Sequence, residues 1–197
     1  MTGRTVFHGT LLALLAAFYS VTAYVALHPR VSEHYRDYYI RRATTDWKVD
    51  HGTARLADGF DFADTVYPQE VDYLRGLALP EPWGRWSDAS MAPAVSILLR
   101  EPVSGSLCLD VRFKATPLQT GAPVVIRLGD HGVTVIPSDA APRDYHIEAQ
   151  LTQPAWAIHL EPSRPAPSGD WDSQTASPRR NAIGLIRLQL RPGPCPG

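Results

Sequence analysis

LCLDVRFK, residues 107–114, alternates apolar and polar side chains along its length. A period of two residues is the pattern that a β-strand imposes, because successive side chains point to opposite faces of the sheet. Leu107, Leu109, Val111 and Phe113 would then face a core, while Asp110, Arg112 and Lys114 would face away from it. The stretch therefore predicts a strand of a sheet that is covered on one side only.

The same alternation recurs on both sides of this stretch. Its apolar members are Val95, Ile97 and Leu99; Val124, Ile126 and Leu128; Val133 and Val135; Tyr145, Ile147, Ala149 and Leu151; Trp156, Ile158 and Leu160; and Ile186, Leu188 and Leu190. Gly129-Asp130-His131-Gly132 has the composition of a hairpin turn. The pattern predicts a mainly β protein, an antiparallel, jelly-roll-like β-sandwich. A parallel α/β fold is excluded because the crossover helices that it needs are missing.

The N-terminal part of the chain has a different character. Residues 11–27, LLALLAAFYSVTAYVAL, contain no charged side chain. Extended back to Val6, they form a helix of roughly 33 Å, enough to cross a hydrocarbon core of about 30 Å. We expect a transmembrane signal anchor over residues 6–27, after a short tail at 1–5. The alternatives are a signal peptide cleaved after Ala23 and a buried helix, which the lack of a polar face disfavours.

Two features of the sequence predict opposite orientations of this span in the membrane. Arg30, Arg36, Arg41 and Arg42 follow the span and Arg4 precedes it, so the count of basic residues places the C-terminal side in the cytoplasm. We expect the opposite orientation, with the strand-rich domain on the extracytoplasmic side of the membrane. The grounds are the acidic residues Glu33 and Asp37 among these arginines and the extracytoplasmic character of the domain.

Three further segments follow the span. Residues 28–42 carry Val31, Tyr35, Tyr38 and Tyr39 at helical spacing. They are expected to form a juxtamembrane amphipathic helix, with the tyrosines either at the lipid headgroups or packed on the domain. Residues 43–71 are expected to connect to the sandwich and to supply an edge strand with Phe60 and Phe62 inward. The sandwich is expected over residues 72–197, with a long polar loop at 162–182.

Composition and motifs exclude several functions. Nineteen basic residues against twenty acidic residues give a net charge of −1, without the basic excess of a nucleic-acid-binding protein. The sequence lacks the GxSxG, HExxH, P-loop and GxGxxG motifs. The histidines have no metal-ligand spacing, and two cysteines cannot build a zinc site alone. We therefore predict no catalytic residues, no metal and no cofactor.

GLALPEPWGRWSD, residues 76–88, is the most distinctive block of the sequence. Tryptophan rings provide stacking surfaces for sugars, and carboxylates and guanidinium groups bind sugar hydroxyls. The candidate glycan-binding residues are Glu81, Trp83, Arg85, Trp86 and Asp88, together with Asp170, Trp171 and Asp172 of the long loop. In the alternative interpretation, both tryptophans cap the core and Arg85 pairs with Asp88 or Glu81.

This block, the strands after it and the terminal AIGLIRLQL strand, residues 182–190 after SPRR, resemble a known family. It is the C-terminal β-sandwich domain of unknown function found on bacterial membrane glycosyltransferases and phosphoglycerol transferases. The resemblance implies a role in envelope polysaccharide synthesis, with the span in a bacterial inner membrane and the strand-rich domain in the periplasm. Two departures stand out, because the last loop is stretched into GDWDSQTASPRRN and a single span takes the place of a catalytic membrane domain.

The resemblance favours a non-catalytic accessory module that binds glycan or docks on a membrane glycosyltransferase. A second hypothesis is a hydrolase or transferase that acts on the same polysaccharide through Glu81, Asp88, Asp170 and Asp172. A third is a structural subunit whose span packs in a membrane complex, for which the small residues Gly9, Ala13, Ala16 and Ala17 offer weak support.

The two cysteines are Cys108, in the polar register of its strand, and Cys195, in the tail RPGPCPG. Because the polar register faces outward, we expect Cys108 to face away from the core. An exposed free thiol is unfavourable in an oxidising compartment, so a Cys108–Cys195 disulfide is one expectation. The alternative is two unpaired cysteines, one of them under a loop.

Overall fold

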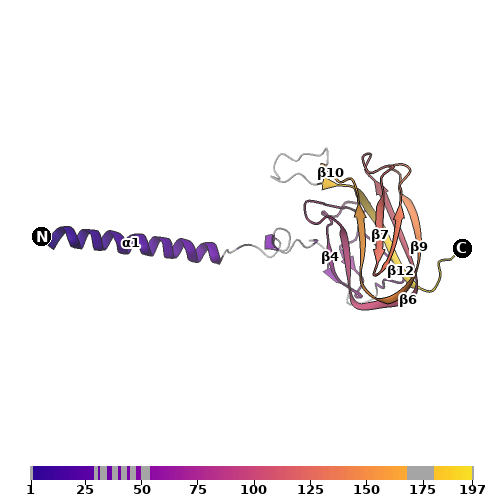
Figure 1. The fold of residues 1–197 in the computed structure, drawn as a ribbon, viewed down its shortest axis with the longest axis horizontal. Coiled ribbons are helices and arrows are strands. Elements are labelled where there is room, and N and C mark those ends of the chain that lie inside the picture. The colour runs from indigo at the N-terminus through magenta and orange to yellow at the C-terminus, as the bar shows by residue number, and fades with distance from the viewer. Residues whose placement is uncertain are drawn as a thin grey trace. The chain divides into compact units, whose positions relative to one another are not determined.

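The computed structural model describes residues 2–28, 31, 35, 36, 40, 44, 48–49, 54–167 and 180–196. Two compact units can be distinguished, Met1–Arg36 and Asp37–Gly197. Figure 1 shows a helix in the first unit and a strand-rich second unit. Most of the expected juxtamembrane helix at 28–42, and Asp170, Trp171 and Asp172, lie outside the described residues.

The helix α1, Thr2–Leu27, forms over the uncharged run. Its side chains from His8 onward are exposed, and most of them are apolar, as is typical of a segment surrounded by lipid. The hydroxyl of Thr22 donates to the carbonyl oxygen of Phe18 at 2.9 Å, so its polar group is satisfied within the helix. Among the described residues, His8–Leu27 is the one segment long and apolar enough to cross a membrane. A signal sequence meets the same criterion.

The second unit consists of strands joined mainly in antiparallel pairs. They are β1 (Lys48–Val49), β2 (Phe60–Asp61), β3 (Val66–Tyr67), β4 (Val71–Arg75), β5 (Arg85–Trp86), β6 (Val95–Ala115), β7 (Val124–Leu128), β8 (His131–Val135), β9 (Arg143–Pro162), β10 (Ala166–Pro167), β11 (Arg180–Asn181) and β12 (Ile183–Pro192). The main sheet has the order β2-β12-β6-β9-β7-β8, with β4 also paired to β6 and β5 to β12. The predicted mainly antiparallel β-sandwich is confirmed.

The long strands β6 and β9 belong to both layers of the sandwich. The first part of β6 pairs with β4 and with the end of β9, and its second part pairs with β12 and with the start of β9. The register shifts between Leu98 and Gly105, where Gly105 has a φ of 81° that glycine adopts without a steric penalty. The strands expected separately at 95–99 and 107–113 are therefore one bent strand (Figure 1).

The core lies between the two layers. Leu109, Val111 and Leu188 contribute from the layer of β2 and β12, and Ile97 and Leu160 contribute from the layer of β4, β7 and β8, all almost fully buried. The core also takes in residues before position 72. Phe60 and Phe62 are buried, and β2 pairs with β12 at the sheet edge, as expected for an edge strand.

Trp156 differs from the expectation. The alternation assigned its ring to the apolar face, but its side chain is 59% exposed, whereas Ala155 and Ile158 are buried. The cause is the bend, because the register between β6 and β9 is interrupted from Leu98 to Val103. At this point the period of two no longer holds, and Trp156 turns outward.

Candidate functional site

The block around Trp83 forms a tight turn followed by β5. Glu81 and Gly84 form a bridge, with N–H···O distances of 2.8 and 3.1 Å. Gly84 has a φ of 149°, and a Cβ atom there would lie 2.1 Å from the carbonyl oxygen of Leu185. Only glycine fits this position, and the turn that it permits brings Trp83 and Trp86 together.

The two tryptophans form a half-buried pair on the outer face of the sheet. Their ring centroids lie 5.1 Å apart with an interplanar angle of 72°, a favourable edge-to-face geometry. Trp86 in β5 is the register partner of Gly184 in β12, which in turn is the partner of Lys114 in β6. The ring of Trp83 covers Gly184, because a Cβ there would lie 2.6 Å from Trp83 Cη2.

Lys114 and Glu81 place charges beside these rings. The ammonium of Lys114 lies 3.3 Å from the ring centroid of Trp83 and 4.8 Å from that of Trp86, in the range of cation–π interactions. The indole Nε1 of Trp83 donates to Glu81 Oε2 at 2.6 Å. Partial burial lowers the pKa of Lys114, and the carboxylate of Glu81 opposes this shift. We call Glu81, Trp83, Trp86 and Lys114 the aromatic patch.

Sequence reasoning identified three members of the aromatic patch and missed Lys114. Its polar register in the stretch 107–114 indicated only that it faces outward. Its place beside the tryptophans depends on β12 lying between β5 and β6, which no local pattern reveals.

Arg85 and Asp88 were predicted to bind ligand, but both side chains are fully buried. Arg85 donates to the carbonyl oxygens of Phe62 and Ala78 at 3.3 and 3.4 Å. Asp88 Oδ1 accepts from the backbone N–H and the hydroxyl of Ser90, at 3.0 and 2.5 Å. These hydrogen bonds satisfy backbone groups and hold residues 76–88 in place. The two buried side chains are out of reach of a ligand at the surface.

The outer face next to the aromatic patch is polar. Asp110 lies between Gln189 and His146 in the sheet, and its carboxylate is held from two sides. Nδ1 of His146 lies 2.5 Å from one oxygen, and the guanidinium of Arg191 binds the other. In the neighbouring row, Arg112 lies 3.8 Å from Asp144. This face offers many donors and acceptors to a ligand rich in hydroxyl groups.

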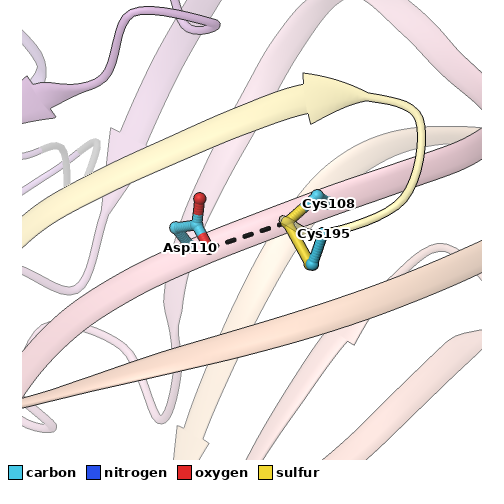
Figure 2. Close-up of side chains that lie close together, drawn as sticks. All are labelled: Cys108, Asp110 and Cys195. Atoms are coloured by element: carbon cyan, nitrogen blue, oxygen red, sulfur yellow. Dashed lines mark hydrogen bonds between the residues drawn. A yellow bond between two sulfur atoms is a disulfide. The ribbon is translucent and has the colours of Figure 1, made fainter. Parts of the chain in front are cut away.

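Cys108 and Cys195 are joined by a disulfide with a Cα–Cα distance of 4.9 Å. Cys108 lies on the outer face, as its register predicts, yet its exposure is 0% because the tail that carries Cys195 covers it. Figure 2 shows the bridge beside Asp110. The ligand atoms of these three residues lie within 4.8 Å of one another, but disulfide sulfurs are not the thiolates that bind metal. The cluster is therefore a cross-link and not a metal site.

Part of the sequence is similar to bacterial transferases. Phosphoglycerol transferase I from Escherichia fergusonii is 27% identical over 143 residues, which cover 72% of this chain and 18% of that protein. The enzymes of the same name from Escherichia coli and Shigella boydii match with the same identity and coverage. The chain thus spans less than a fifth of the length of these relatives.

A distant structural match and a family match complete the comparison. A solved structure described as a carbohydrate binding module of family 29 is 15% identical, with a TM-score of 0.42, and the match covers 67% of this chain and 87% of that one. The resemblance to a domain found on phosphoglycerol transferases is confirmed. Residues 48–192 match the family described as "Domain of unknown function (DUF7024)", and the chain belongs to this family.

Proposed function

We propose that the protein is a non-catalytic, membrane-anchored accessory module of bacterial envelope polysaccharide synthesis or export, and that the aromatic patch binds a glycan. The observation that carries this proposal is the half-buried Trp83–Trp86 pair with Lys114 and Glu81 beside it. Indole faces bind the apolar faces of sugar rings, and the charged groups hydrogen-bond the hydroxyls.

The relationship to phosphoglycerol transferase I supports a role near such an enzyme. We assign the residues that match it the part of an accessory module. The aromatic patch provides stacking surfaces, one cation and one carboxylate, which are groups suited to binding. Burial of Asp88 removes one of the carboxylates on which the alternative enzymatic hypothesis depended.

We place the strand-rich unit in the periplasm and α1 in the inner membrane as a single-pass anchor. The disulfide between Cys108 and Cys195 supports this orientation, because disulfides persist in oxidising compartments. The count of arginines after the span argues against it. A periplasm-dependent phosphatase fused after Gly197 should be active, whereas an active cytoplasmic reporter at the same position would reverse the orientation.

The test of glycan binding compares the full chain with three single variants in lipid nanodiscs. We expect Trp83→Ala and Trp86→Ala to abolish retention on immobilised envelope polysaccharides. Trp156→Ala is the matched control, because this ring is 59% exposed and lies outside the aromatic patch; it should retain glycan as the wild type does. Thermal unfolding of each variant separates lost binding from lost folding.

Two results would contradict the proposal. One is equal retention by all three variants, and the other is failure of the wild type to retain any envelope glycan. A wild type without glycan affinity, combined with a fall in stability for Trp83→Ala and Trp86→Ala, would favour docking on a membrane glycosyltransferase.

A further inference from the structure

Two buried side-chain oxygen atoms at the end of the block 76–88 and the start of the last strand have no hydrogen-bond partner within the described part of the chain. They are Oδ2 of Asp88 and Oδ1 of Asn181. The exposure of Asp88 is 0% and that of Asn181 is 8%. Buried polar atoms are nearly always hydrogen-bonded in folded proteins, so these two exceptions require a physical explanation.

The two residues are neighbours across a pair of hydrogen-bonded segments. The backbone N–H groups on both sides of Asp88 donate to carbonyl oxygens of the segment 180–183, each at 2.8 Å. The N–H of Arg180, directly before Asn181, donates to Asp88 Oδ1 at 3.4 Å. Asp88 therefore lies opposite Asn181, and opposite residues of paired segments have Cβ atoms about 5 Å apart. The two oxygen atoms without partners belong to adjacent side chains.

The charge of Asp88 is not compensated by a basic side chain. Its Oδ1 accepts from the N–H and the hydroxyl of Ser90 and from the N–H of Arg180, and several donors on one oxygen favour an ionised carboxylate. Among the described residues, none forms an ion pair with Asp88. A buried carboxylate without a counter-charge is strongly unfavourable. A water molecule would donate to both oxygens but would leave the charge uncompensated, so the arrangement favours a cation.

The available ligand atoms are all oxygens, which are the ligands of hard cations such as Ca²⁺. Each backbone carbonyl oxygen of the two segments has two lone pairs, so it accepts one hydrogen bond and is still able to bind a cation. Mg²⁺ dehydrates reluctantly and usually keeps several water ligands, which a site closed to solvent disfavours. We propose that Asp88 and Asn181 bind a Ca²⁺ ion, together with backbone carbonyl groups of the same two segments.

The expectation that the protein binds no metal rested on histidine and cysteine ligands, and a site made of oxygen atoms does not require them. Because only one carboxylate takes part, the affinity should be that of weak calcium sites, with a Kd of about 0.1–1 mM. Asp88 follows Trp86 by two residues. The ion would thus fix the end of the block that carries the aromatic patch.

The test is thermal unfolding of the full chain in zwitterionic nanodiscs, either in EDTA or in Ca²⁺ at about ten times the expected Kd or more. Ca²⁺ should raise the wild-type midpoint by about 3–10 °C. Asp88→Asn removes the charge but keeps the shape, so it should abolish this shift. In EDTA this variant should be at least as stable as the wild type, because it no longer buries an uncompensated charge.

Asp64→Asn is the matched control, because Asp64 is exposed and lies outside the site; it should keep the full shift. Asn181→Ala should reduce the shift, since it removes one oxygen ligand. Trp83→Ala should keep it, which separates calcium binding from glycan binding.

A second measurement needs only the wild-type protein. Tb³⁺ occupies calcium sites and luminesces when a nearby tryptophan is excited, and Trp86 is two residues from Asp88. Ca²⁺ should displace Tb³⁺ and quench this signal, whereas Mg²⁺ at the same concentration should not. Empty nanodiscs provide the blank.

The proposal is overturned if Ca²⁺ does not stabilise the wild type, if Asp88→Asn shows the same shift, or if Mg²⁺ displaces Tb³⁺ as well as Ca²⁺ does. Equal stability of the wild type and Asp88→Asn in both EDTA and Ca²⁺ would also overturn it. That result is the one expected if Asp88 is a neutral carboxyl group that donates to Asn181.

Discussion

Replacing Gly184 with alanine tests whether the aromatic patch depends on contact between Trp83 and the backbone of β12. Gly184 has no positive φ, so its backbone accepts an L-residue. The added Cβ would lie 2.6 and 2.8 Å from Cη2 and Cζ3 of Trp83, and 3.1 Å from Cε of Lys114. Because carbon atoms do not approach below 3.0 Å without a shift, the indole ring must move.

The expected cost follows from these contacts. Overpacking typically destabilises by about 1–3 kcal/mol, and loss of the Lys114–Trp83 cation–π interaction adds about 0.5–1 kcal/mol. Alanine recovers roughly 0.5–1 kcal/mol of backbone entropy relative to glycine in a strand. We therefore expect Gly184→Ala to lower the free energy of unfolding by about 1–3 kcal/mol and to abolish glycan retention.

The assay combines thermal unfolding with glycan retention for the full chain. Gly132→Ala is the matched control, because its Cβ would lie 3.5 Å from Arg127 Nη1, an ordinary contact. It should change stability by less than about 0.5 kcal/mol and leave retention intact. If Gly184→Ala behaves in the same way as Gly132→Ala, Trp83 is not held on β12 in the manner described.

Three further predictions concern other parts of the chain. Replacing Cys108 and Cys195 with serine should lower the free energy of unfolding by up to about 4–5 kcal/mol, measured by urea denaturation; an unchanged midpoint would contradict this. In selectively ¹³C-lysine-labelled protein, whose two lysines are Lys48 and Lys114, Lys114 should titrate below the usual pKa of lysine. Because the unfolded chain then holds more protons between the folded and unfolded pKa values, stability should rise with pH in that window; titration at or above the usual pKa would argue against burial. Finally, alkaline carbonate should leave the intact chain in the membrane pellet, whereas a soluble product starting at Tyr24 would indicate a cleaved signal peptide.

The strands could be predicted from sequence because the period of two is a local property. Leu107, Leu109, Val111 and Phe113 face the core as their alternation indicates. Phe60 and Phe62 are inward at an edge strand. The pattern failed at Trp156 because the register there is set by the bend that β9 shares with β6. A bend shared by two strands depends on residues far apart in the sequence, so a single window cannot reveal it.

The candidate site could be predicted only in part, for two physical reasons. Polar side chains at Arg85 and Asp88 look like ligand contacts in a sequence, but buried backbone atoms also need hydrogen-bond partners. Here Arg85 donates to two carbonyl groups, so it supports the fold. Lys114 was missed for the second reason, since its contact with Trp83 arises across three strands.

The strand β6 connects the aromatic patch with the disulfide. Lys114 lies near the end of β6, and Cys108 lies in its second half. The six residue steps between them correspond to roughly 20 Å of extended chain. Substitutions separated by more than about 10 Å without shared partners usually act independently. Replacing the cysteines should therefore lower stability and leave glycan retention by the aromatic patch intact, so the two properties can be measured separately.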